Sequence, residues 1–180
     1  MKKTRSLLAL TLTLLLLLSI GTCAFAEDAK FASTKQYLDD MAQLPGATCT
    51  LESDMLTIGN STYEHVKVDY EGELSKSKSH FDVCFTEETE DMPIEILMSM
   101  TVIHFDPEKL ADVLSEINAI NASTTTIKLY VDTDKNAVMA EFYLLATSAS
   151  VQDISLLSTG IFIGFTDQIY EILSKYDIDS

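Results

Sequence analysis

The sequence predicts an α+β domain in which an antiparallel β-sheet, a meander plus a hairpin, is covered by helices in the order α-β(meander)-α-β-β-α. Apolar and polar residues alternate over most of residues 47–85 and 127–145, which is the two-residue period of a half-buried strand. Over residues 33–44, 107–120 and 150–176 apolar residues recur at three- and four-residue intervals, as in an amphipathic helix. No repeat or linker divides these segments, so we expect one domain.

Residues 1–26 have the composition of a cleaved secretion signal. Three basic residues precede an apolar run at 7–20, and Ala24-Phe25-Ala26 fits the small-x-small rule for cleavage after Ala26. This run is shorter than the roughly 20 residues that a membrane span needs, and no later segment predicts a stop-transfer helix. We therefore expect an exported protein, in the periplasm, the cell envelope or outside the cell, with a single domain at 27–180.

A lipid anchor is the alternative use of this N-terminal segment. Cys23 follows Ile20-Gly21-Thr22, which resembles a lipid attachment site only loosely because the residue before a lipidated cysteine is usually smaller than Thr22. Cleavage after Ala26 is the favoured interpretation.

The charge of the chain excludes one class of partner. The signal holds three of the 12 basic residues and none of the 28 acidic ones, so the mature charge is 9 − 28 = −19, and no arginine remains. Nucleic-acid binding depends on cationic contacts to phosphate, so this class is disfavoured, as is an anionic membrane surface. The charge favours a cationic partner or bound metal ions, or serves solubility alone.

Two cysteines, Cys49 and Cys84, remain after cleavage. An even number in an oxidising compartment is compatible with a single disulfide, which would close a loop of about 35 residues and add about 3 to 4 kcal/mol. Two buried thiols that never meet are the alternative. A chain of this length can form its core without the bridge.

The first predicted helix covers residues 33–44. Ser33 precedes Gln36 with the spacing of a capping box, and Pro45-Gly46 ends the helix. Residues 47–51 and 55–58 are then expected to form a short strand pair around the turn at 52–54. The apolar stripe of the helix consists of Tyr37, Leu38, Met41 and Leu44.

The meander continues through residues 63–70 and 81–85, joined by a polar turn at 75–79. Alternating polar residues in these strands predict one face in contact with water. Residues 94–105 are apolar on both parities, so they form either a central strand or a strand entered from a helical turn.

The second helix is predicted from Asp106-Pro107, an N-cap aspartate followed by proline at the first helical position. Residues 127–131 and 138–144 form the two strands of the hairpin, turned at 132–136. The apolar face of this helix consists of Leu110, Val113, Leu114, Ile117 and Ile120.

The third helix is expected to begin at Ser150 as its N-cap and to run towards Tyr176. Gly160 and Gly164 lie four residues apart within it, a spacing that suggests helix dimerisation in a membrane but close packing on a sheet in a soluble helix, which we favour. Its apolar stripe is predicted to comprise Val151, Ile154, Leu157, Ile161, Phe165, Ile169 and Ile172.

Residues 118–132 carry a family resemblance. Asn118-Ala119-Ile120-Asn121 ends a helix and is followed by the strand Ile127-Lys128-Leu129-Tyr130-Val131-Asp132. This order is similar to the YbjN family of bacterial proteins, described as regulators of sensory transduction, and the resemblance extends over residues 34–176. It implies the fold of type III secretion chaperones and a binding or regulatory module, often a homodimer, with no established catalytic residues. The export signal departs from members that act in the cytoplasm.

Three groups of residues are weighed as metal sites. Asp132-Thr133-Asp134-Lys135-Asn136 matches the first ligand positions of an EF-hand loop, but Ala137 and Tyr143 stand where that loop needs glycine and glutamate. We favour a hairpin turn. The acidic run at 87–91 is either a binding site for a cation or a solvated loop. We favour the solvated loop.

The histidines form the third group. His65 and His80 share the polar parity of neighbouring strands, so they are candidates to face each other, with Asp69 or Asp82 beside them; no ligand spacing supports a metal there. His104, beside the helix cap, is interpreted as structural.

The sequence carries no G-x-S-x-G elbow, no H-E-x-x-H and no glycine-rich phosphate loop, and nothing calls for a cofactor. We therefore expect no enzyme. The leading hypothesis is an exported, non-enzymatic binding or regulatory domain of YbjN type that takes a protein or peptide. The alternative is an extracytoplasmic binder of a small ligand or cation. The third hypothesis is a hydrolase without a recognisable motif.

Overall fold

The computed structural model describes residues 28–73 and 78–179. The predicted signal at 1–26, its cleavage position at Ala26 and the alternative anchor at Cys23 lie outside these residues, as does most of the turn predicted at 75–79. The described chain is an α+β fold, as the sequence predicts. One antiparallel sheet of seven strands has the order β1-β3-β4-β5-β7-β6, and β2 pairs with the beginning of β3.

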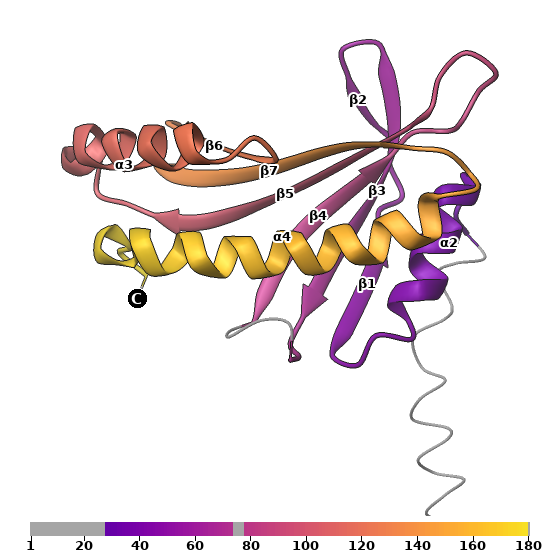
Figure 1. Cartoon of the computed structure of the whole chain (residues 1–180), viewed down its shortest axis with the longest axis horizontal. Helices are drawn as coiled ribbons and strands as arrows, with labels where there is room; N and C mark the ends of the chain where they lie inside the picture. The colour runs from indigo at the N-terminus through magenta and orange to yellow at the C-terminus, as the bar shows by residue number, and fades with distance from the viewer. Residues whose placement is uncertain (1–27, 74–77, 180) are drawn as a thin grey trace, which may run out of the picture.

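Helices and strands follow one another along the chain as Figure 1 shows. The strands are β1 (Ala47–Leu51), β2 (Leu56–Ile58), β3 (Ser61–Tyr70), β4 (Ser79–Phe85), β5 (Ile94–His104), β6 (Ile127–Asp132) and β7 (Ala137–Ala146). The helices are α2 (Ala32–Met41), α3 (Leu110–Ser123) and α4 (Val151–Leu173), with short 3₁₀ turns η2 (Pro107–Lys109) and η3 (Ser174–Tyr176).

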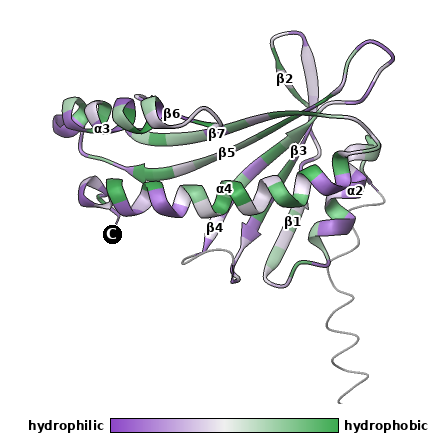
Figure 2. Ribbon diagram, viewed as in Figure 1, coloured by the Kyte–Doolittle hydropathy of each residue, from purple (hydrophilic) through white to green (hydrophobic). Residues whose placement is uncertain are grey.

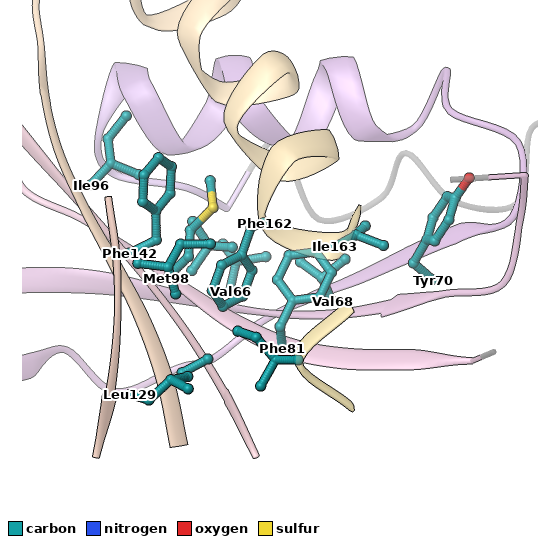
Figure 3. Packing of buried hydrophobic residues seen from close by; sticks show 14 of the residues in the cluster. Val66, Val68, Tyr70, Phe81, Ile96, Met98, Leu129, Phe142, Phe162 and Ile163 are labelled. Atoms are coloured by element: carbon teal, nitrogen blue, oxygen red, sulfur yellow. The ribbon is translucent and has the colours of Figure 1, made fainter. Parts of the chain in front are cut away.

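The core lies between one face of the sheet and the helices. Phe162 of α4 stacks on Phe142 of β7 with a centroid distance of 6.4 Å and meets Phe81 of β4 edge-on at 5.9 Å. Figure 3 shows these rings among the aliphatic side chains of the central strands. Such burial of apolar area is the main favourable term in folding. Because the helices take one face, the opposite face of the sheet is left to solvent.

The beginning of the meander differs from the prediction. Residues 47–51 and 55–58 do not pair with each other; both pair with β3, Leu51 opposite Val66 and Leu56 opposite Tyr63. β3 is ten residues long, which is enough for β2 to pair with its beginning and β1 with its end. The sequence-based pairing was wrong because β3 begins at Ser61, before the alternation in the sequence becomes regular.

The start of α2 also differs. The helix begins at Ala32 with Phe31 as N-cap, so Ser33 lies inside the helix and donates to the carbonyl of Thr86 at 3.3 Å. The predicted capping box is therefore wrong. The buried carboxylate of Glu64 on β3 supplies the missing acceptors instead, at 2.6 Å from the Lys30 N–H and 2.8 Å from that of Phe31. An anion at this end of a helix satisfies free N–H groups and complements the helix dipole.

The helix–hairpin unit at the centre of the sequence is confirmed. Asp106 accepts the N–H of Glu108 at 2.9 Å as N-cap, and α3 follows. Residues 94–105, which the sequence left open, contain the central strand β5, paired with β4 on one side and β7 on the other. β6 and β7 form the predicted hairpin, and β7 rather than β6 joins β5, so β6 is an edge strand.

The orientation of α4 corrects the predicted stripe. Val151 and Ile169 are buried, but Leu157 is 66% exposed, Ile161 47% and Ile172 45%. The face against the sheet is rich in hydroxyl side chains: Ser155, Ser158, Thr159 and Thr166. These hydroxyls donate to carbonyls of their own helix, with Thr159 to Ser155 and Thr166 to Phe162 both at 2.9 Å. Small, internally satisfied side chains let the helix approach the sheet closely.

Gly164 does not fit the favoured interpretation. A Cβ placed on this residue would have no neighbour within 4 Å, so Gly164 faces away from the sheet and is not a close-packing position there. None of the helices among residues 28–73 and 78–179 combines the length and apolarity that crossing a membrane requires.

Candidate functional site

The face of the sheet opposite the helices, called the open face from here on, is the most extensive candidate surface. Antiparallel pairing fixes which side chains share it, because directly paired residues point to the same side. One row crosses six strands: Thr50, Lys67, Asp82, Ser99, Glu141 and Lys128. Neighbouring rows hold the tyrosines and histidines described below. This surface mixes charges, aromatic rings and aliphatic side chains.

An aromatic and acidic patch at one end of the open face draws its residues from β3, β5 and β7, of which β5 and β7 are neighbours and β3 lies beyond β4. It consists of Tyr63, Glu95, Leu97, Tyr143 and Leu145, and is called the tyrosine patch here. Glu95 is paired with Leu145, and Leu97 with Tyr143. Tyr143 is 52% exposed and Leu145 55%, whereas Tyr63 is buried and donates its hydroxyl to Glu95. The patch therefore surrounds one carboxylate with two phenol rings and two aliphatic side chains.

The tyrosines of this patch are held in their neutral form. Burial, followed by the hydrogen bond to Glu95, raises the pKa of Tyr63 to about 12. Burial and the charge of Glu95 likewise raise the pKa of Tyr143. A phenol beside a carboxylate keeps its proton because ionisation would place two negative charges together. At neutral pH the two phenols therefore keep their protons, which they share with Glu95 through hydrogen bonds.

A third tyrosine repeats this arrangement at the far edge of the open face. Burial, followed by the hydrogen bond to Glu141 and the charge of Asp132, raises the pKa of Tyr130 to about 12. Tyr130 is 41% exposed on the edge strand β6. The open face therefore carries three tyrosines that each lie beside a carboxylate.

An open depression of about 660 Å³ lies at the other end of the open face. It is called the polar depression here, and side chains of both charges line it: Lys67, Asp69, His80, Asp82, Lys135 and Asp179. The chain end from Asp177 to Asp179 forms one wall, since the N–H of Ile178 donates to the carbonyl of His104 at 3.0 Å.

The histidines of this region pair with aspartates and not with one another. His65 lies opposite Cys84 and His80 opposite Asp69, so the register places the two imidazoles in rows four residues apart along the strands, about 13 Å. The predicted facing pair is therefore wrong. The Nε2 atom of His65 is 2.7 Å from Asp82, His80 bonds Asp69, and the Nδ1 atom of His104 is 2.7 Å from Asp179. His104 is structural in the sense expected, tying the chain end to β5.

These imidazole–carboxylate pairs form two of the three parts of a nucleophilic triad. Within residues 28–73 and 78–179, neither a hydroxyl nor a thiol is hydrogen-bonded to the second ring nitrogen of any histidine. A nucleophile needs that contact for activation. The His65–Asp82 and His80–Asp69 pairs instead link the neighbouring strands β3 and β4 on the sheet surface.

The residues weighed as metal ligands have other roles. The Oδ1 atom of Asp132 accepts the N–H groups of Asp134 and Lys135 at 3.1 and 3.2 Å, and Asn136 adopts a left-handed φ of 50°. This is the geometry of an Asx turn, so the favoured hairpin turn is confirmed. Across the described part of the chain, no three His, Cys, Asp or Glu side chains are gathered closely enough to hold a metal ion.

The acidic run at 87–91 is a solvated loop between β4 and β5, as favoured from the sequence. Its position is fixed at two points. The N–H of Thr89 donates to the carbonyl of Met92 at 3.0 Å, and Glu88 accepts the N–H of Ser148 at 3.0 Å.

Cys49 and Cys84 are free thiols that the structure keeps apart. Cys49 is paired with Val68 and Val68 with Phe81, so Cys49 points to the helix-covered face. Cys84, three residues beyond Phe81, points to the open face, two strands away. Their separation across the sheet exceeds the Cα distance that a disulfide spans, so the bridge considered from the sequence does not form in this fold. Burial raises the pKa of both thiols to about 12, so neither is a thiolate at neutral pH.

Sequence reasoning missed the tyrosine patch. Its signal was present: Tyr143 and Leu145 occupy the polar parity of a strand whose other parity carries Phe142 and Leu144. Two apolar residues on the solvent-facing side of a strand indicate a surface that contacts something other than water.

Comparisons with protein-family models, with curated proteins and with solved structures find no match for this chain.

Proposed function

We propose that this protein is an exported, non-enzymatic binding domain whose open face takes an extended protein or peptide segment that carries both cationic and apolar side chains. The observation that carries the proposal is the tyrosine patch, in which Tyr143 and Leu145 of β7 stand exposed beside Glu95 of the neighbouring strand β5. Single exposed apolar residues are ordinary, but a contiguous aromatic and aliphatic group on a sheet surface is typical of a binding site.

The chemistry of the patch favours a lysine or arginine side chain of the partner. Glu95 supplies the opposite charge, and the exposed phenol ring of Tyr143 offers a face for the aliphatic stem and the cation. Leu97 and Leu145 provide contacts for a neighbouring apolar side chain. The mature charge, 9 − 28 = −19, attracts such a partner from a distance and speeds its association.

Two further points support the class of function. The N-terminal segment has the composition of an export signal, and residues 118–132 resemble the YbjN family, which implies a binding or regulatory module. A role in binding also agrees with thiols and phenols that keep their protons at neutral pH.

Isothermal titration calorimetry with two blocked decapeptides tests the proposal. One alternates lysine with leucine and the other glutamate with leucine, and the protein spans Glu27 to Ser180, which contains the whole described fold. We expect binding of the lysine peptide only. Glu95→Gln should weaken it about two- to fivefold, the range for a partly exposed ion pair. Tyr143→Ser should weaken it further because both the ring face and its apolar area are lost.

Leu114→Ser is the matched control, because Leu114 is an exposed apolar residue on α3, away from the open face. Thermal unfolding of each variant separates loss of binding from loss of fold. Equal binding of the two peptides, or an unchanged affinity in Tyr143→Ser, contradicts the proposal.

The polar depression favours a second candidate, the binding of a small ligand with both charges. Its walls combine Lys67 and Lys135 with Asp69 and Asp179. Zwitterionic probes, namely betaines and amino acids, can be added to the wild type and to Asp69→Asn. Binding is followed by the imidazole resonance of His80. Saturable shifts that Asp69→Asn abolishes support this candidate, and their absence removes it.

A further inference from the structure

The outer surface of α4 carries an apolar stripe that nothing in the described chain covers. Leu157, Ile161 and Ile172 are 66%, 47% and 45% exposed, and Phe165, at the margin of the stripe, packs partly against the core of its own chain. Figure 2 shows α4 crossing the sheet with hydrophobic segments along its length. Each of these residues costs free energy in water, and together they line about 22 Å of one helix surface.

The spacing of the stripe is the same from both ends. Its members are 157, 161, 164, 165, 168 and 172, so the intervals are four, three, one, three and four residues. In an antiparallel pair of these helices, Leu157 of one copy therefore meets Ile172 of the other, and Ile161 meets Gln168. A surface that matches itself under a two-fold rotation is what an isologous dimer requires.

Gly164 and Phe165 lie at the centre of this pattern. A Cβ on Gly164 would touch nothing within the described chain, so no contact inside the fold accounts for a glycine in the middle of a helix. Glycine there costs helix stability relative to alanine. Its missing side chain leaves room for the exposed part of Phe165 of a second copy, so two helices can approach closely there.

The charges of the helix agree with an antiparallel arrangement. The stripe itself holds no charged residue between positions 157 and 172, although the chain has a net charge of −16. Asp153 lies at the N-terminal end of α4, and Lys175, 55% exposed, lies just beyond its C-terminal end, where its Nζ is 2.6 Å from Glu116 of the same chain. Antiparallel pairing brings Asp153 of one copy towards the Lys175–Glu116 pair of the other and opposes the two helix dipoles favourably.

From these observations we infer that the stripe Leu157–Ile161–Gly164–Phe165–Gln168–Ile172 is the docking surface for a second copy of this chain, with α4 packed against α4 antiparallel around an axis between residues 164 and 165. This homodimer surface is separate from the open face, so the inference does not rest on the proposed function. Both open faces remain accessible in the dimer because α4 covers the opposite side of each sheet.

Sedimentation equilibrium of the chain from Glu27 to Ser180 measures the association. We expect a monomer–dimer equilibrium that tightens as salt screens the repulsion between two acidic chains. Gly164→Gln and Ile161→Gln should each weaken the dimer at least tenfold. Gly164→Gln should also raise the thermal midpoint of the diluted monomer, because the new side chain meets open space and improves helix propensity.

Two control variants separate this surface from others. Tyr143→Gln, on the open face, and Ile178→Gln, an exposed apolar residue at the chain end, should leave the dimer constant unchanged. Conversely, Ile161→Gln should leave binding of the lysine peptide intact. Failure of peptide binding with an intact dimer, or the reverse, shows which proposal is wrong.

Engineered cysteines in a background of Cys49→Ser and Cys84→Ser test the axis. Gly164→Cys should form a cross-linked dimer on mild oxidation, Leu157→Cys alone should not, and Leu157→Cys combined with Ile172→Cys should. A chain that stays monomeric at millimolar concentration overturns the inference, and so does efficient cross-linking of Leu157→Cys alone, which indicates a parallel arrangement.

Discussion

The side-chain carboxamide of Asn121 takes the place of a neighbouring strand beside Leu129. Its Nδ2 donates to the carbonyl of Leu129 at 2.8 Å, and its Oδ1 accepts the N–H of Leu129 at 2.9 Å. β6 is an edge strand, and an exposed edge is a template for pairing with another chain. A carboxamide offers a donor and an acceptor, as a peptide group does. The Asn121 side chain therefore satisfies the backbone N–H and carbonyl of Leu129 in the middle of the β6 edge.

Asn121→Ala should lower the free energy of unfolding by about 1 to 3 kcal/mol, because the N–H and carbonyl of Leu129 lose their partners. Asn121→Asp should also destabilise, since a carboxylate accepts from the N–H but repels the carbonyl. Urea unfolding gives these values. The control is Asn118→Ala on an exposed face of the same helix. Equal losses for the alanine variants at 118 and 121 would show that the contact contributes nothing.

The cap of α2 gives the second prediction. Glu64→Gln keeps one acceptor for the N–H groups of Lys30 and Phe31 but removes the charge and the second acceptor. We expect a loss of about 1.5 to 3 kcal/mol, as for hydrogen bonds to a charged group. Glu87→Gln, in the solvated loop, should change stability by less than about 0.5 kcal/mol. A similar stability for both variants would be evidence against capping by Glu64.

The thiols give the third prediction. A non-reduced proteolytic digest of the folded protein, analysed by mass spectrometry, should contain Cys49 and Cys84 in separate peptides, because they point to opposite faces. At pH 8 both should react with a thiol reagent much more slowly in the folded protein than in urea, since burial raises the pKa of each to about 12. Recovery of a Cys49–Cys84 linked peptide would refute this arrangement of strands.

Alkaline pH should destabilise the protein. The pKa of Tyr63 is about 12 in the folded state and about 10 in an unfolded chain, so the unfolded state loses its proton first. This contribution is therefore complete below pH 10 and falls as the pH rises through 12. Urea unfolding at pH 8 and pH 11 should show a smaller decline in Tyr63→Phe than in the wild type. An identical decline would mean that Tyr63 ionises normally.

The sequence predicted the fold well where one pattern dominated. Asp106-Pro107 marked the beginning of the second helix, and the alternation around the turn at 132–136 predicted the hairpin, because capping and turn chemistry are local. The pairing of β1 and β2 with β3 could not be predicted in the same way. It depends on the full length of β3, whose first residues do not alternate regularly.

Long-range contacts explain the remaining differences. Ser33 had the sequence signature of a cap, but Glu64, 31 residues away, supplies the acceptors. In α4 the larger apolar residues predicted the buried face, whereas close approach to the sheet selects small hydroxyl residues such as Thr159 and Thr166. The exposed Leu157 and Ile161 then become a surface that needs its own explanation. The tyrosine patch was hidden for a related reason, since its members come from three strands.

The most direct test of the open face as a binding site is a titration of ¹⁵N-labelled protein with the lysine–leucine decapeptide. We predict progressive, saturable shifts of the amide resonances of Glu95, Leu97, Tyr143 and Leu145, with those of Leu157 and Ile161 on α4 unchanged. Shifts confined to α4, or no saturable shift in the tyrosine patch, would contradict this account.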